Sequence, residues 1–259
     1  MTASAFDLHR RLAAEGLGTA LLLAIVVGSG VMGEQLSGGN TAVALMLNTL
    51  STGAGLAVLI TLLGPVSGAQ FNPLVTASEI RVGAFGAREG LLRVAVQLLG
   101  AFAGVLMAHA MFDLPLLQVS DKLRSGAGQV FSEAVATFGL ILVIRLAGRL
   151  APDRVAALVA LYITAAYGFT ASTSFANPVV TLARSLTDTF AGIAPISVPG
   201  FLLGQGLGAI LALKVSDWLF SQAGSRPSGR YQGLRAGWRG RRAGRGEGRG
   251  RRSPAGSPP

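Results

Sequence analysis

The chain has 259 residues, of which 51% are hydrophobic and only 13% are charged, and its mean hydropathy is +0.54. This composition excludes an ordinary water-soluble domain and indicates an integral membrane protein. The net charge of +10 comes almost entirely from residues 223–259, which hold ten of the 22 Lys and Arg residues and one of the 12 acidic residues, and the chain has no cysteine for disulfides or thiolate metal sites.

The first apolar stretch, about residues 16–33, follows a polar start that contains Arg10 and Arg11. A basic start before an apolar run is also typical of a cleaved signal peptide. We interpret the stretch as a retained span, because Glu15 at its start has a counterpart, Glu133, in the second half of the chain.

A second apolar stretch, about residues 41–63, runs directly into a box that contains Asn72 and Pro73. The residue before a proline is pushed out of the helical region, and proline suits the first turn of a helix. We therefore expect a loop that enters the membrane and starts a short helix at Pro73. The side chain of Asn72 would cap that helix, which should end near residue 80.

Three further spans are predicted at about residues 91–112, 130–146 and 155–169. The last of these is marginal, because roughly 20 residues are needed to cross the hydrocarbon core. A second box follows it and repeats the first, with Asn177 and Pro178, two apolar residues and a threonine. Its half helix should reach about residue 186, and a sixth span is expected at about residues 198–220.

The two halves are internal repeats. Glu15 and Thr19 open the first span as Glu133 and Thr137 open the fourth, and the boxes lie 105 residues apart. Three spans in each half require the halves to lie inverted in the membrane. The predicted fold is therefore an all-α membrane protein with six transmembrane helices and two re-entrant half helices, in an inverted 3+3 repeat. The repeats occupy about residues 10–112 and 128–220 of a channel domain at 1–222.

Basic residues are concentrated at the N-terminus, after the first half helix, after the fourth span and in the tail at 223–259. The positive-inside rule then places both termini in the cytoplasm. The tail, rich in Arg, Gly and Pro, should be disordered. Arg-Gly tracts can bind RNA, but attraction to anionic headgroups is the simpler interpretation, so we expect no specific nucleic-acid partner.

Two carboxylates within the spans, Glu15 and Glu133, are candidate functional residues. They can form a proton or ion site of a transporter, or each can hydrogen-bond the backbone of the adjacent re-entrant loop. Gln97 and Gln205 are expected to bond between helices. The sequence contains no nucleophile–base pair and no metal-ligand cluster, so we expect no enzyme activity, cofactor or metal.

The two boxes resemble the Asn-Pro-Ala boxes of the aquaporin (major intrinsic protein) family, carried here as Asn-Pro-Leu and Asn-Pro-Val, and the resemblance covers roughly residues 10–220. It implies a passive channel that forms a homotetramer with one pore per subunit. It also implies a pore centre at Asn72, Pro73, Asn177 and Pro178, and it favours the loop-supporting role of the glutamates.

In that family four positions, counted from the box asparagines, narrow the pore. By spacing they are Thr52, Ala165, Ser174 and Val180. Most relatives have an aromatic residue at the first and arginine at the last, so the resemblance implies a wide filter without fixed charge. Arg184, one helical turn beyond Val180, is interpreted either as a residue of the outer mouth or as a helix-end charge bonded to carbonyls.

This filter is similar to that of aquaglyceroporin-like channels found with bacterial arsenic-resistance genes. The resemblance implies a bacterial inner membrane and, as solutes, glycerol-like polyols, arsenous acid or methylated arsenicals, and some water. One alternative is an ordinary water or glycerol facilitator. The other, from a different class, is a secondary transporter coupled to protons through Glu15 or Glu133.

Overall fold

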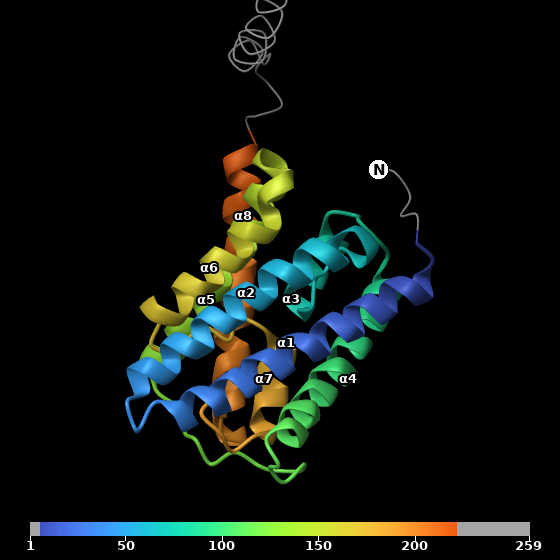
Figure 1. Cartoon of the computed structure of the whole chain (residues 1–259). Helices are drawn as coiled ribbons and strands as arrows, with labels where there is room; N and C mark the ends of the chain where they lie inside the picture. Colours follow the sequence, from blue (N-terminus) through green and yellow to red (C-terminus); the bar gives the residue numbers. More distant parts are fainter. Residues whose placement is uncertain (1–5, 222–259) are drawn as a thin grey trace, which may run out of the picture. The chain divides into compact units, whose positions relative to one another are not determined.

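A computed structural model describes residues 6–221, and every regular element in that range is a helix (Figure 1). Residues up to Asp217 form one compact unit, to which the contacts described below belong. The tail at 223–259, expected to be disordered, lies outside the described residues.

The first half contains three long helices and a short one. Helix α1 begins earlier than predicted, because the carboxylate of Asp7 accepts the N–H of Arg10 at 2.9 Å and caps the helix ahead of the apolar stretch. The short helix starts at Pro73, as predicted. The elements are α1 (Leu8–Leu36), α2 (Thr41–Ser67), α3 (Pro73–Arg81) and α4 (Ala87–Met111).

The second half repeats this order, and its short helix starts at Pro178, as predicted. The predicted spans at 155–169 and 198–220 coincide with two of its helices. The elements are α5 (Ala127–Leu150), η1 (Pro152–Arg154), α6 (Val155–Phe169), α7 (Pro178–Ala183), η2 (Arg184–Leu186), η3 (Pro195–Ser197) and α8 (Val198–Phe220).

Five helical segments among the described residues are long and apolar enough to cross a membrane: α1, α2, α4, α5 and the segment containing α8. Helix α6 has 15 residues and, at about 1.5 Å per residue, is the short span that the sequence indicates. With α6 the fold has six spans and two half helices, the all-α inverted arrangement that was predicted.

Backbones approach closely at matching places in the two halves. In Figure 1, α1 lies beside α4, and a Cβ added to Gly104 of α4 would come within 2.2 Å of the Ala20 carbonyl oxygen of α1. In the second half, a Cβ added to Gly208 of α8 would come within 2.2 Å of the Ala134 carbonyl oxygen of α5. Glycine at these positions therefore allows the contacts that hold each half together.

Candidate functional site

The two Asn-Pro boxes have the same backbone geometry. Asn72 and Asn177 are extended, with φ of −155° and −156°, and each caps the half helix that follows. The carboxamide oxygen of Asn72 accepts the N–H of Leu74 at 2.9 Å, and that of Asn177 accepts the N–H of Val179 at 3.1 Å. The side chains are thereby fixed at the two helix N-termini.

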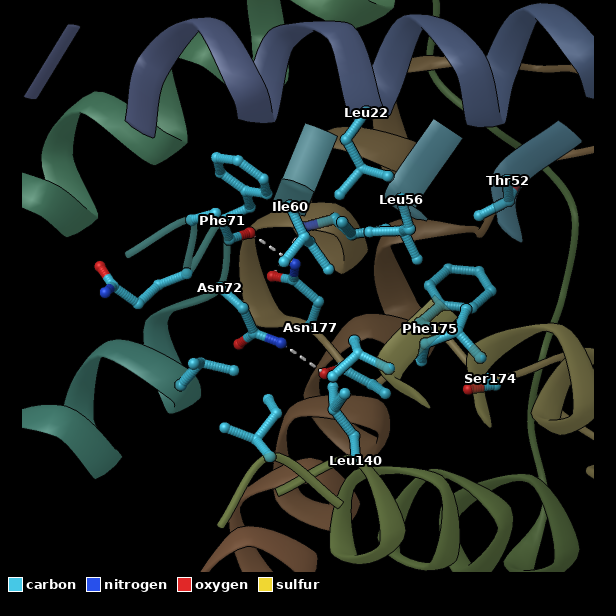
Figure 2. Close-up of a pocket in the computed structure, with 18 of the residues that line it drawn as sticks. Leu22, Thr52, Leu56, Ile60, Phe71, Asn72, Leu140, Ser174, Phe175 and Asn177 are labelled. Carbon is cyan, nitrogen blue, oxygen red and sulfur yellow. Dashed lines mark hydrogen bonds between the residues drawn. The ribbon is translucent and has the colours of Figure 1, made fainter. Parts of the chain in front are cut away.

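The boxes are also joined to each other. The Asn72 Nδ2 group donates to the Ala176 carbonyl at 2.8 Å, and the Asn177 Nδ2 group donates to the Phe71 carbonyl at 2.8 Å (Figure 2). Phe71 and Ala176 have φ of +50° and +48°, in the left-handed region. These reciprocal bonds keep the N-termini of α3 and α7 together.

A cavity of about 110 Å³ lies along this junction. Figure 2 shows Phe71 and Asn72 on one side of it and Thr52, Ser174 and Phe175 on the other. No charged side chain of residues 6–221 lines the cavity, and most of its wall is apolar. Its polar side chains are Thr52, Gln70, Asn72, Tyr167, Ser174 and Asn177.

Three of the four predicted filter residues, Thr52, Ser174 and Val180, line this cavity. The hydroxyl oxygens of Thr52 and Ser174 are buried and have no hydrogen-bond partner among residues 6–221. Unpaired buried hydroxyls are rare in native proteins, and a water molecule or solute beside them would supply the missing bond.

The structure corrects the fourth position, because Ala165 is exposed and does not line the cavity. The cavity-facing stripe of α6 runs at four-residue spacing and includes Val159, Ile163 and Tyr167, so Ala165 points away from it. Counting back from Asn177 therefore gives the wrong helix face. An aromatic ring, Tyr167, lines the wall where a small side chain was expected.

Arg184 is buried, with 1% of its surface exposed, and does not reach solvent at a mouth. Its Nε group donates to the Ala191 carbonyl, and its guanidinium carbon lies 3.4 Å from the centroid of the Phe175 ring. Of the two interpretations, the structure contains the carbonyl-bonded one. Phe175, whose ring Arg184 contacts, lines the cavity, whereas Arg184 does not.

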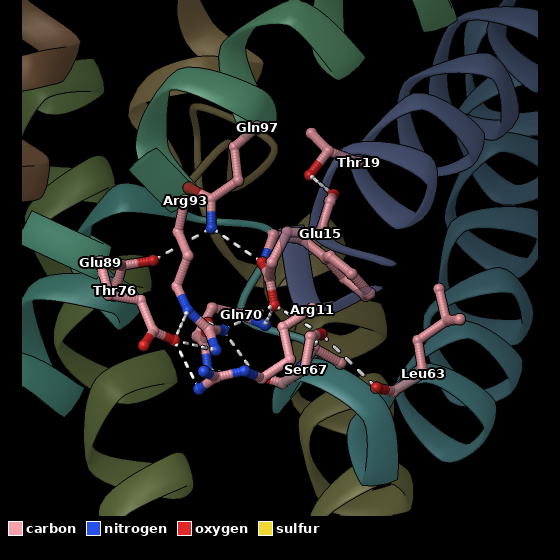
Figure 3. Close-up of polar contacts among 12 residues, drawn as sticks. Arg11, Glu15, Thr19, Leu63, Ser67, Gln70, Thr76, Glu89, Arg93 and Gln97 are labelled. Atoms are coloured by element: carbon pink, nitrogen blue, oxygen red, sulfur yellow. Dashed lines mark hydrogen bonds and ion pairs between the residues drawn. The ribbon is translucent and has the colours of Figure 1, made fainter. Parts of the chain in front are cut away.

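Glu15 supports the first re-entrant loop (Figure 3). One carboxylate oxygen accepts the Ser67 hydroxyl at 2.7 Å and the Gln70 N–H at 3.0 Å, and the other accepts the Phe71 N–H at 2.9 Å. Gln97 donates to the second oxygen at 2.9 Å and to the Thr76 hydroxyl at 3.0 Å.

Glu133 holds the second loop in the same way. One oxygen accepts the Ser172 hydroxyl at 2.6 Å and the Phe175 N–H at 2.8 Å, and the other accepts the Ala176 N–H at 2.9 Å. Gln205 donates to that second oxygen at 2.6 Å and to a threonine hydroxyl of α7 at 2.8 Å. Neither glutamate lines the cavity.

Sequence reasoning gave no role to Arg93. Arg93 is buried within α4, and its guanidinium lies 3.4 Å from Glu15 and 2.8 Å from Glu89. Glu89 is also paired with Arg11 at 2.8 Å. The four-residue spacing of Glu89 and Arg93 was a usable signal, because it places both on one helix face.

Two cations of the loop between α4 and α5 pack against the loop that follows η2. Lys122 donates to the Phe190 carbonyl at 2.9 Å, and Arg124 donates to the Gly192 carbonyl at 2.8 Å. Burial lowers the pKa of Lys122, and the nearby charge of Arg124 adds to this effect. Burial also lowers the pKa of Arg124, and Glu133 partly opposes the effect. Among the described residues, no group of His, Asp or Glu side chains could hold a metal ion.

Comparisons with known proteins give consistent similarities. A family model described as major intrinsic protein matches residues 2–149. Aquaglyceroporin AqpS of Rhizobium meliloti (strain 1021) is 52% identical over 218 residues, which are 84% of this chain and 93% of that protein. Aquaporin NIP6-1 of Arabidopsis thaliana is 28% identical over 227 residues, covering 82% and 72% of the two chains.

A solved structure of the aquaglyceroporin from Plasmodium falciparum is similar in fold. It superimposes with a TM-score of 0.62 at 21% sequence identity, over 82% of this chain and 96% of that one. At this identity the match concerns the fold alone.

Proposed function

The chain belongs to the major intrinsic protein family, and on that premise we propose that it is a passive channel for small uncharged solutes. The solutes are glycerol-like polyols, arsenous acid or methylated arsenicals, and some water. The observation that carries this proposal is a cavity without charged side chains that runs along the junction of two half-helix N-termini.

The electrostatics of the junction support passage of neutral molecules. Each helix N-terminus carries about half a positive charge, and here two of them meet beside the cavity. Asn72 and Asn177 add amide donors from both boxes. Positive potential and hydrogen-bond donors at one place disfavour cations and protons while accepting the oxygens of neutral solutes.

The chemistry of the filter supports solutes larger than water. Thr52 and Val180 stand where most relatives have an aromatic residue and arginine, and the hydroxyls of Thr52 and Ser174 have no partner among residues 6–221. Uncharged molecules with several hydroxyl groups can bond these oxygens in turn. Arsenous acid is uncharged near neutral pH and resembles a polyol in its hydroxyls.

The surroundings of the two glutamates argue against coupling to protons. Both carboxylates lie off the cavity, and each accepts at least four hydrogen bonds from serine, glutamine and backbone donors. Donors of the re-entrant loops and of the neighbouring helices thus occupy both oxygens of each carboxylate. This supports a loop-supporting role for Glu15 and Glu133.

We place the protein in a bacterial inner membrane, as a homotetramer with both termini in the cytoplasm. The basic residues near Arg81, Arg149 and Arg154 support that orientation by the positive-inside rule. On this orientation α3 points toward the cytoplasm and α7 toward the outside.

Stopped-flow light scattering on proteoliposomes tests the proposal. The native chain should pass water, glycerol and arsenous acid faster than empty vesicles do. Val180→Arg should reduce glycerol and arsenous acid permeability more than water permeability, because a long cation would cross the filter. Native vesicles that match empty ones for all three solutes would overturn the channel assignment.

A further inference from the structure

Tyr167 is the one tyrosine of α6 that lines the cavity, and none of the sequence-based filter positions includes it. It follows Ile163 by one helical turn on the cavity-facing stripe, and 4% of its surface is exposed. Ser174, Phe175 and Val180 line the same cavity. Its phenol ring therefore belongs to the wall at which solutes are sorted.

A second tyrosine on the same helix shows what a structural phenol does here. The hydroxyl of Tyr162 donates toward the Ala136 and Val135 carbonyls of α5, at 3.2 and 3.3 Å, and Tyr162 does not line the cavity. The Tyr167 hydroxyl has no such partner within residues 6–221, and it is not one of the buried atoms there that lack a bond. It is therefore open to the cavity, where a solute can bind it.

A buried arginine, Arg184, and a half-buried one, Arg124, pack against Phe175 in this part of the wall. The guanidinium carbons of Arg184 and Arg124 lie 3.4 and 5.1 Å from the centroid of the Phe175 ring. Tyr167 lies within electrostatic range of both cations.

We propose that Tyr167 determines solute specificity, because it supplies from α6 the aromatic ring that Thr52 and Val180 lack, together with a further hydrogen-bond donor. Its donor bonds an oxygen of a polyol or of a neutral oxyacid as the solute passes this part of the wall. Its ring limits the width beside Ser174. This inference rests on the proposed channel function and names the residue that sets the solute class of the same cavity.

The effect should differ between solutes. Water that loses one bond to the wall keeps bonds to neighbouring waters, whereas a polyol beside Tyr167 has only the few other polar groups of the wall to replace it. A hydrogen bond contributes about 0.5–1.5 kcal/mol net, which corresponds to roughly two- to tenfold in permeability. Tyr167→Phe should thus lower glycerol permeability about two- to tenfold and leave water permeability nearly unchanged.

The test uses purified full-length protein in proteoliposomes, with water, glycerol and the larger polyol erythritol as probes. Tyr162→Phe is the matched control, since it removes a hydroxyl from the same helix outside the cavity. It should change thermal stability and leave the glycerol-to-water ratio as in the native chain. Tyr167→Ala removes the ring as well, and it should raise erythritol permeability relative to water.

The outcomes separate this inference from the function on which it rests. Native vesicles no faster than empty ones would overturn the channel function and this inference together. Native vesicles that conduct, with Tyr167→Phe and Tyr167→Ala giving native ratios, would overturn the inference alone. If Tyr167→Phe does not fold, Tyr167→Ala still decides the question through the erythritol-to-water ratio.

Discussion

The two halves hold their re-entrant loops with the same hydrogen bonds but with different charges. Glu15 and Glu133 each accept a serine hydroxyl, two consecutive loop N–H groups and a glutamine, at matching positions relative to the two boxes. Glu15 also has an ion pair with buried Arg93 at 3.4 Å. Within residues 6–221, Glu133 has no ion pair.

This difference indicates which part of each cluster the fold requires. A loop with left-handed residues has N–H groups that cannot join a helix, and a carboxylate satisfies two of them at once. That need is common to both halves. Among the described residues, the compensating cation is found in the first half only. There Arg93 extends a chain of ion pairs through Glu89 to Arg11 on the α3 side. On the α7 side, Lys122, Arg124 and Arg184 bond backbone carbonyls instead.

Removing Arg93 should have the largest effect on stability. Arg93→Leu leaves the buried carboxylate of Glu15 without its cation, and breaking a buried pair costs about 3–5 kcal/mol. Denaturant unfolding of the detergent-solubilised protein measures this cost. Arg81→Leu is the matched control, because the pair of Arg81 with Asp217 is largely exposed and should contribute at most about 1 kcal/mol. Equal costs for the two variants would contradict the role given to Arg93.

Replacing the two glutamates tests the comparison directly. An amide cannot accept all the donors that a carboxylate accepts, so Glu133→Gln should cost about 1–3 kcal/mol through unsatisfied buried donors. Glu15→Gln loses the same bonds and the attraction of Arg93 as well, so its cost should be larger. Unfolding midpoints of the two variants, measured in one detergent, give the order. A larger cost for Glu133→Gln would show that the ion pair does not stabilise the first half.

The sequence alone was sufficient for the fold because its signals are local. Apolar length predicts the spans, Pro73 and Pro178 predict the half-helix starts, and Glu15 with Glu133 indicates the inverted repeat. It was insufficient for Ala165, because a position counted through a loop depends on how that loop winds. It also missed Arg93. An arginine near the start of a predicted span is typical of a basic loop, and only the structure shows that Glu15 lies beside it.

The glutamine pair should show what the halves share. Gln97→Leu and Gln205→Leu each remove two bonds, one to a glutamate and one to a threonine hydroxyl. Both should cost about 1–3 kcal/mol, with similar values, because their surroundings match. Unfolding measurements on the two variants check the equality. Costs that differ by more than about 2 kcal/mol would contradict the matched geometry of the clusters.

Lys122 should give the smallest effect, visible only in alkaline solution. Burial lowers its pKa in the folded protein below the usual 10.5, so between the folded pKa and 10.5 the unfolded chain binds more protons. Stability from this group therefore rises with pH through that window. Lys122→Met should remove the rise, which thermal unfolding at several pH values measures. If the stability of the native protein falls through this window and that of Lys122→Met does not, the pKa of Lys122 is not lowered by burial.

The concentration dependence of glycerol flux, with and without a pH gradient across the vesicle, tests most directly whether this protein is a passive channel. With both glutamates held off the cavity by their donors, we expect the initial flux to rise linearly with glycerol concentration and to be the same with and without the gradient. Flux that saturates and increases with the pH gradient would contradict this account. Glu15 or Glu133 would then be a proton site, and the chain a coupled transporter.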